Sequence, residues 1–278
     1  MKTLNLAEKN RALCKKAQEV RLSILDMVTN AKSSHIGSAF SIVEILTIIY
    51  NEFMSTNLIK NKAKNRDYFI LSKGHAASAF YATLASVGIV SSDLLSTFYQ
   101  DGSVLAGHPT KDCVAGVEAS TGSLGHGLSM AVGIAFACKQ DGLSSKAYVL
   151  LGDGECQEGS VWEAVMLAVR LKLNNLIIII DSNKLQGFDR TEDLLPSSLK
   201  NMFEGFGCNC LSVDGHDFIE LRTAIGFCGQ THGPDVIIAN TIKGNGVSFM
   251  QDKLEWHYKS LSPEQYILAK NEILKHKI

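Results

Sequence analysis

The segment from residue 147 to residue 186 constrains the fold more than any other part of this 278-residue chain. Residues 148–151 (YVLL) are a short apolar run closed by glycine, which is typical of a buried strand. Residues 160–171 predict a helix that is apolar over most of its surface and is therefore expected to be largely buried. Residues 176–180 (LIIII) predict a second buried strand. This strand–loop–helix–strand order predicts two parallel strands joined by a right-handed crossover.

Two side chains with oxygen ligands follow these two strands. Asp153 comes directly after the first strand, and Asn183 follows the second. Because parallel neighbouring strands end at the same edge of a sheet, we expect both side chains at the edge where open α/β sheets bind ligands. A carboxylate, an amide oxygen and a nearby backbone carbonyl suit a hard cation such as Mg²⁺. The glycines beside Asp153 would let a diphosphate approach the backbone.

An ordinary dinucleotide-binding loop is the alternative interpretation of this segment. Gly152 and Gly154 are followed by Gly159, so the spacing differs from G-x-G-x-x-G. Asp181 could imitate the acidic residue that binds a ribose. However, Asp153 would repel a bare pyrophosphate unless a cation lay between them, which favours a metal–diphosphate site.

The rest of the chain also alternates helices and strands. Residues 68–71, 208–213 and 235–241 predict further strands. The spacings Asn5-x-x-Glu8, Ser41-x-x-Glu44 and Ser160-x-x-Glu163 predict helix starts. Asp217 is expected to cap a later helix, and Pro263 to open the last one. The pattern predicts one doubly wound α/β domain over residues 1–278, with a mainly parallel sheet and helices on both faces.

Composition excludes several classes of function. The formal net charge is −1, so no basic field indicates binding to nucleic acid or to a membrane. We see neither an apolar signal core at the amino terminus nor a window of transmembrane length. Seven cysteines without C-x-x-C spacing indicate buried free thiols, and we expect a cytoplasmic protein.

Histidines next to glycines form the second group of candidate functional residues. Six of the eight histidines lie within two residues of a glycine: His35, His75, His108, His126, His216 and His232. One such histidine is more often structural than catalytic. Several on loops that follow strands favour a functional site, since histidine transfers protons near neutral pH.

These motifs together resemble a known family. Gly152-Asp153-Gly154 followed by Asn183 resembles the thiamine-diphosphate motif, and nearly the whole chain resembles the amino-terminal, diphosphate-binding part of transketolase. The resemblance implies thiamine diphosphate and Mg²⁺, or another divalent cation. It implies that Asp153, Asn183 and the backbone carbonyl of Leu185 hold the metal.

The resemblance also assigns roles to single residues. His35 in Ser-His-Ile-Gly and His108 in Gly-His-Pro match substrate-side histidines, and we expect a flexible loop at Ile36 and Gly37. His75 in Ser-Lys-Gly-His matches a contact to the diphosphate. The residues expected to bind the cofactor are His75, Gly122, Ser123, Leu124, Gly154, Glu155, Asn183 and His257. The residues expected to be catalytic are His35, His108, His257 and Glu158. The chain departs from the family at Ile36 and Ser123, where proline is common.

Several assignments stay open at the sequence level. Glu158 and Glu163 match acidic residues that lie near the subunit interface in the family and take part in proton communication, but Glu163 also has the position of a helix cap. We assign His216 to turn structure. His232 and His276 are treated as surface residues.

The resemblance stops where a complete enzyme would continue. Thiamine diphosphate supplies the electron sink, but its aminopyrimidine needs a carboxylate. In the family, that carboxylate belongs to a second, pyrimidine-binding domain. We therefore expect a split transketolase that transfers a two-carbon ketol unit between sugar phosphates. A separate carboxy-terminal subunit would complete the site, with two copies of each chain.

Two other functions remain possible at this stage. The first is a related ketol transferase that acts on modified sugars such as sulfosugars, or a deoxyxylulose-phosphate synthase-like enzyme. The loops that carry His35 and His108 favour transketolase over the synthase. The second is a non-catalytic binding or regulatory module. The joint presence of Asp153, Asn183 and the histidines argues against it.

Overall fold

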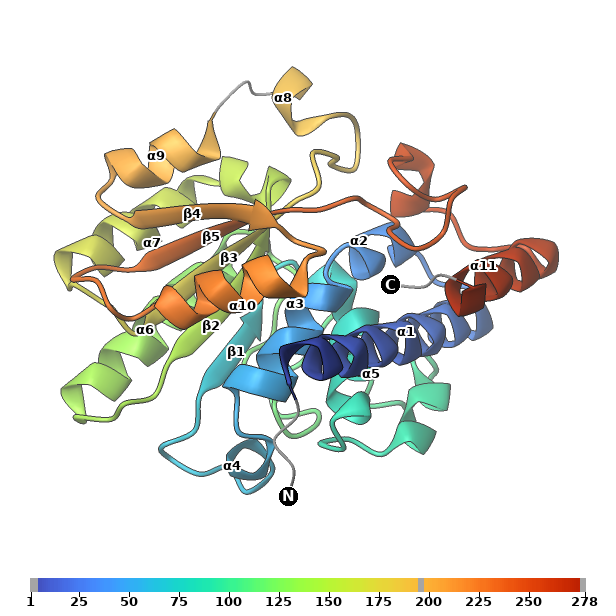
Figure 1. Cartoon of the computed structure of the whole chain (residues 1–278), viewed down its shortest axis with the longest axis horizontal. Helices are drawn as coiled ribbons and strands as arrows, with labels where there is room; N and C mark the ends of the chain where they lie inside the picture. Colours follow the sequence, from blue (N-terminus) through green and yellow to red (C-terminus); the bar gives the residue numbers. More distant parts are fainter. Residues whose placement is uncertain (1–4, 195–197, 276–278) are drawn as a thin grey trace.

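The computed structural model describes residues 5–194 and 198–275, and a five-stranded sheet lies at its centre (Figure 1). All neighbouring strands pair in parallel, in the order β1-β2-β3-β5-β4. The strands are β1 (Tyr68–Leu71), β2 (Ala147–Gly152), β3 (Leu176–Ser182), β4 (Asn209–Asp214) and β5 (Asp235–Asn240). The predicted strands are all present, and their ends differ from prediction by at most two residues.

Alternate side chains of the strands pack into two hydrophobic cores, one on each face of the sheet. Ile177 and Ile179 of β3 belong to one core, whereas Ile178 and Ile180 belong to the other. Strands buried on both faces have no polar side, which explains the continuous apolar run in β3. Helices on both faces of a parallel sheet confirm the predicted doubly wound α/β fold.

One face carries the larger core and the larger set of helices (Figure 1). The helices of this core are α1 (Leu6–Asn30), α2 (Ile36–Phe40), α3 (Val43–Ile48), α4 (Thr56–Lys60), α5 (Ala77–Ser86), α10 (Phe218–Phe227) and α11 (Pro263–Lys275). A π-helical turn, η1 (Ile49–Phe53), continues α3. The 3₁₀ turns are η2 (Gly74–Ala76), η3 (Ser92–Thr97), η4 (Gly154–Gln157) and η5 (Leu254–His257).

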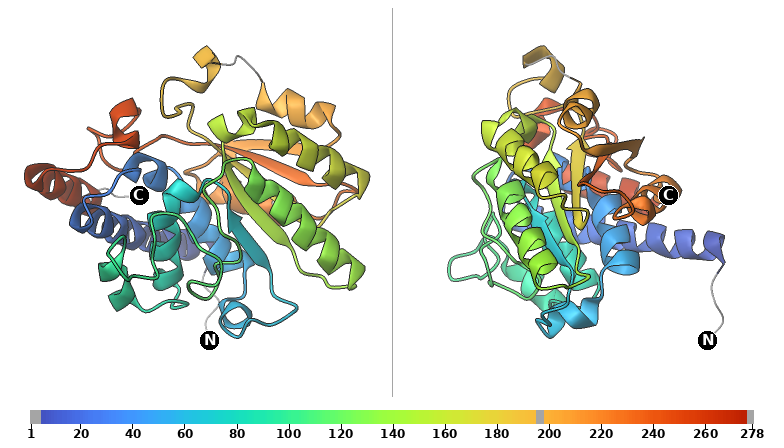
Figure 2. Two further views of the ribbon diagram at one scale, coloured as in Figure 1. Left: turned by 180° about the vertical axis from the view of Figure 1, so that it is seen from behind. Right: turned by 90° about the vertical axis from the view of Figure 1, so that its left-hand side faces the viewer.

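The opposite face is covered by α6 (His126–Gln140), α7 (Gly159–Arg170) and α9 (Leu199–Gly205). Helices α6 and α7 run side by side across this face in the view from behind (Figure 2). The short helix α8 (Thr191–Leu194) lies beyond the carboxyl ends of the strands. Among the residues described, no helix is both long enough and apolar enough to cross a bilayer.

Some of the helix caps predicted from residue spacing are present in the structure, and others are not. Asn5 and Glu8 form the predicted capping box at α1, and Asp217 caps α10. The other two predicted caps are wrong. Ser41 lies between α2 and α3, and its hydroxyl donates to the buried carboxylate of Asp181. Ser160 lies inside α7, which starts at Gly159 and has no side-chain cap.

The prediction that α7 is largely buried is also wrong. Its buried residues lie on one side, at Val161, Ala164, Val165 and Ala168. Leu167 is 50% exposed and Met166 is 51% exposed on the other side. The helix therefore packs on the sheet through one stripe, and its outer side carries the exposed Met166 and Leu167 together with the exposed Glu163 and Arg170. His276 lies outside the described residues.

Candidate functional site

A cavity of about 490 Å³ lies at the carboxyl edge of the sheet. Loops that follow β1, β2 and β3 line it together with the segments around His35 and His257. The predicted site residues that line it are His35, His75, His108, Gly122, Leu124, Asp153, Gly154, Glu155, Glu158, Asn183, Leu185 and His257. Ser123 lies between two lining residues, but its exposed hydroxyl contacts His126 instead.

Asp153 is a buried carboxylate at the floor of this cavity. Its oxygens accept from the backbone N–H groups of Gly154, at 2.8 Å, and of Lys184. Burial and the nearby Asp181 raise the pKa of Asp153 to about 6, even though the two backbone donors oppose the shift. The raised pKa means that the surroundings disfavour the ionised carboxylate of Asp153. A bound cation would stabilise that ionised form.

Asn183 is oriented by a buried neighbour. Its amide nitrogen donates to Asp181 Oδ2 at 2.8 Å, which turns the amide oxygen the other way, where it accepts from the Leu185 backbone N–H. Asp181 also accepts from Lys73 and Ser41. Burial raises the pKa of Asp181, but Lys73 outweighs this effect and holds it below its ordinary value. Asp181 is fully buried behind the cavity, so the ribose-binding alternative is wrong.

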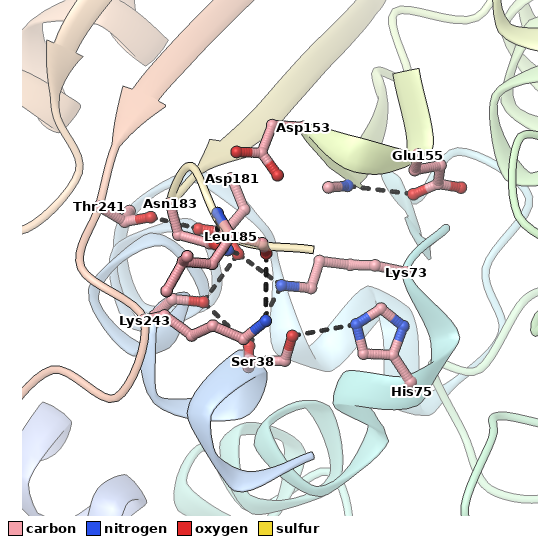
Figure 3. Close-up of polar contacts among 12 residues, drawn as sticks. Ser38, Lys73, His75, Asp153, Glu155, Asp181, Asn183, Leu185, Thr241 and Lys243 are labelled. Carbon is pink, nitrogen blue, oxygen red and sulfur yellow. Dashed lines mark hydrogen bonds and ion pairs between the residues drawn. The ribbon is translucent and has the colours of Figure 1, made fainter. Parts of the chain in front are cut away.

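The carbonyl of Leu185 lies next to the buried ammonium group of Lys243 (Figure 3). Lys243 Nζ donates to the carbonyls of Leu185 and Gln186, both at 3.1 Å, and lies 2.8 Å from His257 Nδ1. Burial and the positive charge of Lys73 lower the pKa of Lys243 to about 8. Two lysines thus place positive charge beside the edge where a diphosphate was predicted.

The oxygen set fits a hard cation better than a soft one. Within residues 5–194 and 198–275, no three His, Cys, Asp or Glu side chains gather as a metal cluster. A metal here would depend on one carboxylate with amide and carbonyl oxygens, which suits Mg²⁺. The adjoining cavity also fits a polar ligand. A Cβ on Gly154 would lie 2.6 Å from the Gln186 side chain, whose Nε2 has no hydrogen-bond partner among the described residues.

Four histidines that line the cavity form a cluster, and His257 joins this cluster to the corner that holds Lys243. The ring of His35 lies 5.2 Å from that of His75, 5.1 Å from that of His257 and 6.4 Å from that of His108. Burial is the main cause that lowers their pKa values, to about 4 for His35 and about 3 for His257. The pKa of His75 falls well below its usual range, and that of His108 is also lowered. The cluster is therefore neutral near pH 7.

His35 is held in an unusual backbone conformation. It has φ 70° and precedes α2 directly, and its N–H donates to the carbonyl of His257 at 3.0 Å. The sequence led us to expect a flexible loop at Ile36 and Gly37, but both residues are buried in α2. The position of His35 is therefore set by the start of α2 and by the hydrogen bond to His257.

Comparison with known proteins identifies the family. The family model described as "Transketolase, thiamine diphosphate binding domain" matches residues 13–274. The chain belongs to the transketolase thiamine-diphosphate-binding domain family. The predicted family, enzyme class and thiamine diphosphate cofactor are thereby confirmed.

Relatives of this transketolase domain include separate subunits and longer enzymes. An apulose-4-phosphate transketolase subunit of Phocaeicola vulgatus is 39% identical, covering 92% of each chain. The 6-deoxy-6-sulfo-D-fructose transketolase subunit SqwG of a Clostridium species is 35% identical, over 97% of this chain and 99% of the relative. A crystal structure of Campylobacter jejuni transketolase superposes with a TM-score of 0.87 at 31% identity. The match covers 97% of this chain but 43% of that one.

The acidic residues of the transketolase domain have different surroundings. Glu155 is buried and joins three segments, because it accepts from Ser72 and from the backbone N–H groups of Gly125 and Gly152. Burial raises its pKa. Glu158 is exposed at the rim of the cavity, and Glu163 is exposed on α7. Their expected role at a subunit interface stays a prediction.

Sequence reasoning missed five residues of the transketolase site. Ser38, Lys73 and Gln186 line the cavity, and the fully buried Asp181 and Lys243 lie behind it. Lys73 and Lys243 each precede a glycine in a loop at the carboxyl edge of the sheet, and this pattern was a usable signal. Asp181 gave a misleading signal, since an acid at the end of a strand can also bind a ribose.

Proposed function

We propose that the chain is the amino-terminal subunit of a split transketolase. It would transfer a two-carbon ketol unit from a ketose phosphate to an aldose phosphate, with thiamine diphosphate and Mg²⁺. The observation that carries the proposal is the convergence of Asp153, Asn183 and the Leu185 carbonyl at one sheet edge, in the same cavity as a cluster of neutral histidines.

The metal and the diphosphate would lie at the corner described above. Asp153, Asn183 and the Leu185 carbonyl would hold Mg²⁺, while Gly154 and the 122–124 backbone leave room for the cofactor. Thiamine diphosphate, when bound, supplies the electron sink for breaking and forming the carbon–carbon bond. Lys73 and Lys243 reduce the accumulation of negative charge when a diphosphate enters.

The histidine cluster would act on the sugar and on the diphosphate. Neutral imidazole both donates and accepts hydrogen bonds, so His35, His108 and His257 can hold sugar hydroxyl groups and move their protons. His75, whose Nε2 lies 3.0 Å from the hydroxyl of Ser38, faces the cavity from the loop after β1. We assign it to the diphosphate.

A partner subunit is part of the proposal. The described residues lining the cavity include Glu155 and Glu158, but Glu155 is fully engaged by three donors and Glu158 lies at the rim. The carboxylate for the aminopyrimidine would come from a carboxy-terminal subunit with a pyrimidine-binding domain, in an assembly of two copies of each chain. The seven free cysteines fit a reducing, cytoplasmic setting.

Modified sugars are the second candidate substrates. Three relatives that match this chain over more than nine tenths of their own length are named for apulose 4-phosphate or for 6-deoxy-6-sulfo-D-fructose. We therefore include a branched-chain sugar phosphate and a sulfosugar beside the common ketose phosphates. A synthase-like reaction or a non-catalytic module is less consistent with the complete histidine cluster.

Reconstitution tests the proposed function. The purified chain should show little or no ketol transfer with Mg²⁺ and thiamine diphosphate. Activity should appear when it is mixed with a chain that carries the pyrimidine-binding domain. The substrate panel then identifies the sugar. Full activity from the single chain would refute the split enzyme, and an inactive but correctly assembled complex would refute transketolase activity on that panel.

A further inference from the structure

His216 lies outside the cavity but contacts the loop of Lys243, whose ammonium group reaches residues that line the cavity. It follows β4 in the sequence Asp-Gly-His-Asp. Its Nε2 lies 2.8 Å from the backbone nitrogen of Ile242 and must accept from that N–H. The ring proton is therefore on Nδ1, which lies 2.9 Å from Glu44 Oε2 and donates to it. The side-chain nitrogen of Asn245 also lies 2.9 Å from Nδ1, but a protonated Nδ1 cannot accept from it, so the hydrogen bonds of the ring are those to Ile242 and Glu44.

The same carboxylate forms a buried ion pair. Arg21 of α1 meets both oxygens of Glu44 of α3, at 2.6 and 2.8 Å, and both side chains are 1% exposed. Arg21 Nε also donates to the carbonyl of Asn245 at 3.0 Å. One network thus holds the loop at two points, through His216 at Ile242 and through Arg21 at Asn245.

Lys243 lies between these two points. Its ammonium group reaches the carbonyls of Leu185 and Gln186 and the ring of His257. The loop around it packs closely, since a Cβ on Gly244 would lie 2.6 Å from the Met250 carbonyl and a Cβ on Gly246 would lie 3.0 Å from Arg21. A displaced Ile242 backbone would therefore carry the ammonium group of Lys243 with it.

We propose that His216 is a positioning residue of the cofactor site. With Glu44 and Arg21, it holds residues 242–245 so that Lys243 stays beside the Leu185 carbonyl and His257. The inference rests on the proposed function, because it assigns the network to cofactor binding. The role of His216 thus goes beyond the turn structure that its local sequence predicts.

A second ion pair of the fold provides a control that distinguishes loss of positioning from a general loss of stability. Arg222 of α10 meets both oxygens of Glu52, at 2.6 and 2.8 Å, but this pair does not contact residues 242–246. Arg222→Ala therefore removes an ion pair with the same two-point geometry, whose side chains are 20% and 22% exposed where those of Arg21 and Glu44 are 1% exposed. It should lower stability without changing the position of Lys243.

The experiment compares three changes at one position. H216A removes both contacts, H216N keeps a donor near Glu44 but does not reach Ile242, and H216Q can place an acceptor near the Ile242 N–H. Hydrogen exchange on the full, cofactor-free chain should show the Ile242 amide at least about 5-fold faster in H216A and H216N, from the loss of about 1 kcal/mol. H216Q should restore the protection.

Cofactor binding is then measured in the complex with the carboxy-terminal subunit, with thiamine diphosphate and Mg²⁺ as the probe. H216A and H216N should lower affinity about 10- to 100-fold, as outer contacts around metal sites typically do, and H216Q should recover most of it. R222A should bind like the wild type.

The outcomes separate the possible failures. Unchanged affinity in H216A, equal losses in H216Q and H216N, or an equal loss in R222A would overturn the positioning role. If H216A does not fold, the comparison of H216Q with H216N decides. A wild-type complex that does not bind thiamine diphosphate would overturn the proposed function instead. The exchange data would then still decide whether His216 holds the Lys243 loop.

Discussion

The backbone N–H of His35 donates to the carbonyl oxygen of His257 at 3.0 Å, which joins the amino-terminal third of the chain to its last loop. The two rings lie 5.1 Å apart at 83° to each other. The hydrogen bond therefore fixes the distance between two of the proposed catalytic histidines through the backbone, independently of their side chains.

Asp153→Asn should remove Mg²⁺-dependent cofactor binding and preserve the fold. The change keeps the size of the side chain but removes the one carboxylate of the proposed oxygen set. We expect affinity for thiamine diphosphate to fall by more than about 100-fold, the upper range for contacts outside the metal's own ligands. Calorimetry on the assembled enzyme, with and without Mg²⁺, measures this. Unchanged affinity would exclude Asp153 as a metal ligand.

His75→Ala and His35→Ala should have different effects. A hydrogen bond to a charged group contributes about 1.5–3 kcal/mol, so loss of His75 should weaken cofactor binding about 10- to 150-fold. His35→Ala should leave cofactor affinity nearly intact and lower turnover about 10²- to 10⁴-fold, if His35 transfers protons.

Cofactor titration and turnover at saturating cofactor separate these two histidine roles in the assembled enzyme. The exposed His232, changed to alanine, is the control and should behave like the wild type. The opposite result, with cofactor affinity lost in His35→Ala and turnover alone lost in His75→Ala, would reverse the two assignments.

Asp181→Asn should destabilise the chain because it leaves Lys73 buried without its carboxylate. Lys73 and Asp181 are at most 1% exposed, and breaking such a pair by changing one partner typically costs about 3–5 kcal/mol. Adding Lys73→Met should recover part of the loss. Urea unfolding of the single and double variants measures both steps. A double variant less stable than Asp181→Asn would show that Lys73 has other essential partners.

The Glu44 network predicts an acid-dependent loss of stability. Burial raises the pKa of Glu44, but Arg21 and His216 outweigh it and lower the pKa from 4.5 to about 2. A carboxyl group whose pKa is lower in the folded chain than in the unfolded chain stabilises the fold at pH values above the unfolded-state pKa. The stabilisation by Glu44 is therefore complete above pH 4.5. It is lost as the pH falls through 4.5 towards 2 and amounts to about 3 kcal/mol.

Unfolding by urea between pH 2.5 and 7 tests this pH dependence. Glu44→Gln should lower stability at pH 7 and flatten the acid slope of the wild type. The exposed Glu192, changed to glutamine, is the control and should keep the slope. A slope that Glu44→Gln leaves unchanged would assign the acid sensitivity to other carboxyl groups.

The sequence by itself determined the sheet and the edge at which the site forms. Residues 176–180 of β3 are all apolar because both faces of the strand are buried, and such a run can be recognised from consecutive residues alone. Parallel pairing then places the residues after β2 and β3 at one edge, so Asp153 and Asn183 could be assigned to one corner. The cap at Asn5 was also predictable, since its partner is three residues away.

Only the tertiary structure decided which polar residues complete that corner. Ser41 and Ser160 have the spacing of helix caps, but burial gave Ser41 a partner in Asp181, and α7 starts before Ser160. Lys73 meets Asp181, and Lys243 meets the Leu185 carbonyl, across loops far apart in the chain. A buried charge needs a partner within hydrogen-bonding distance, and tertiary packing determines which residue lies that close. The spacing of residues along the sequence does not contain this distance.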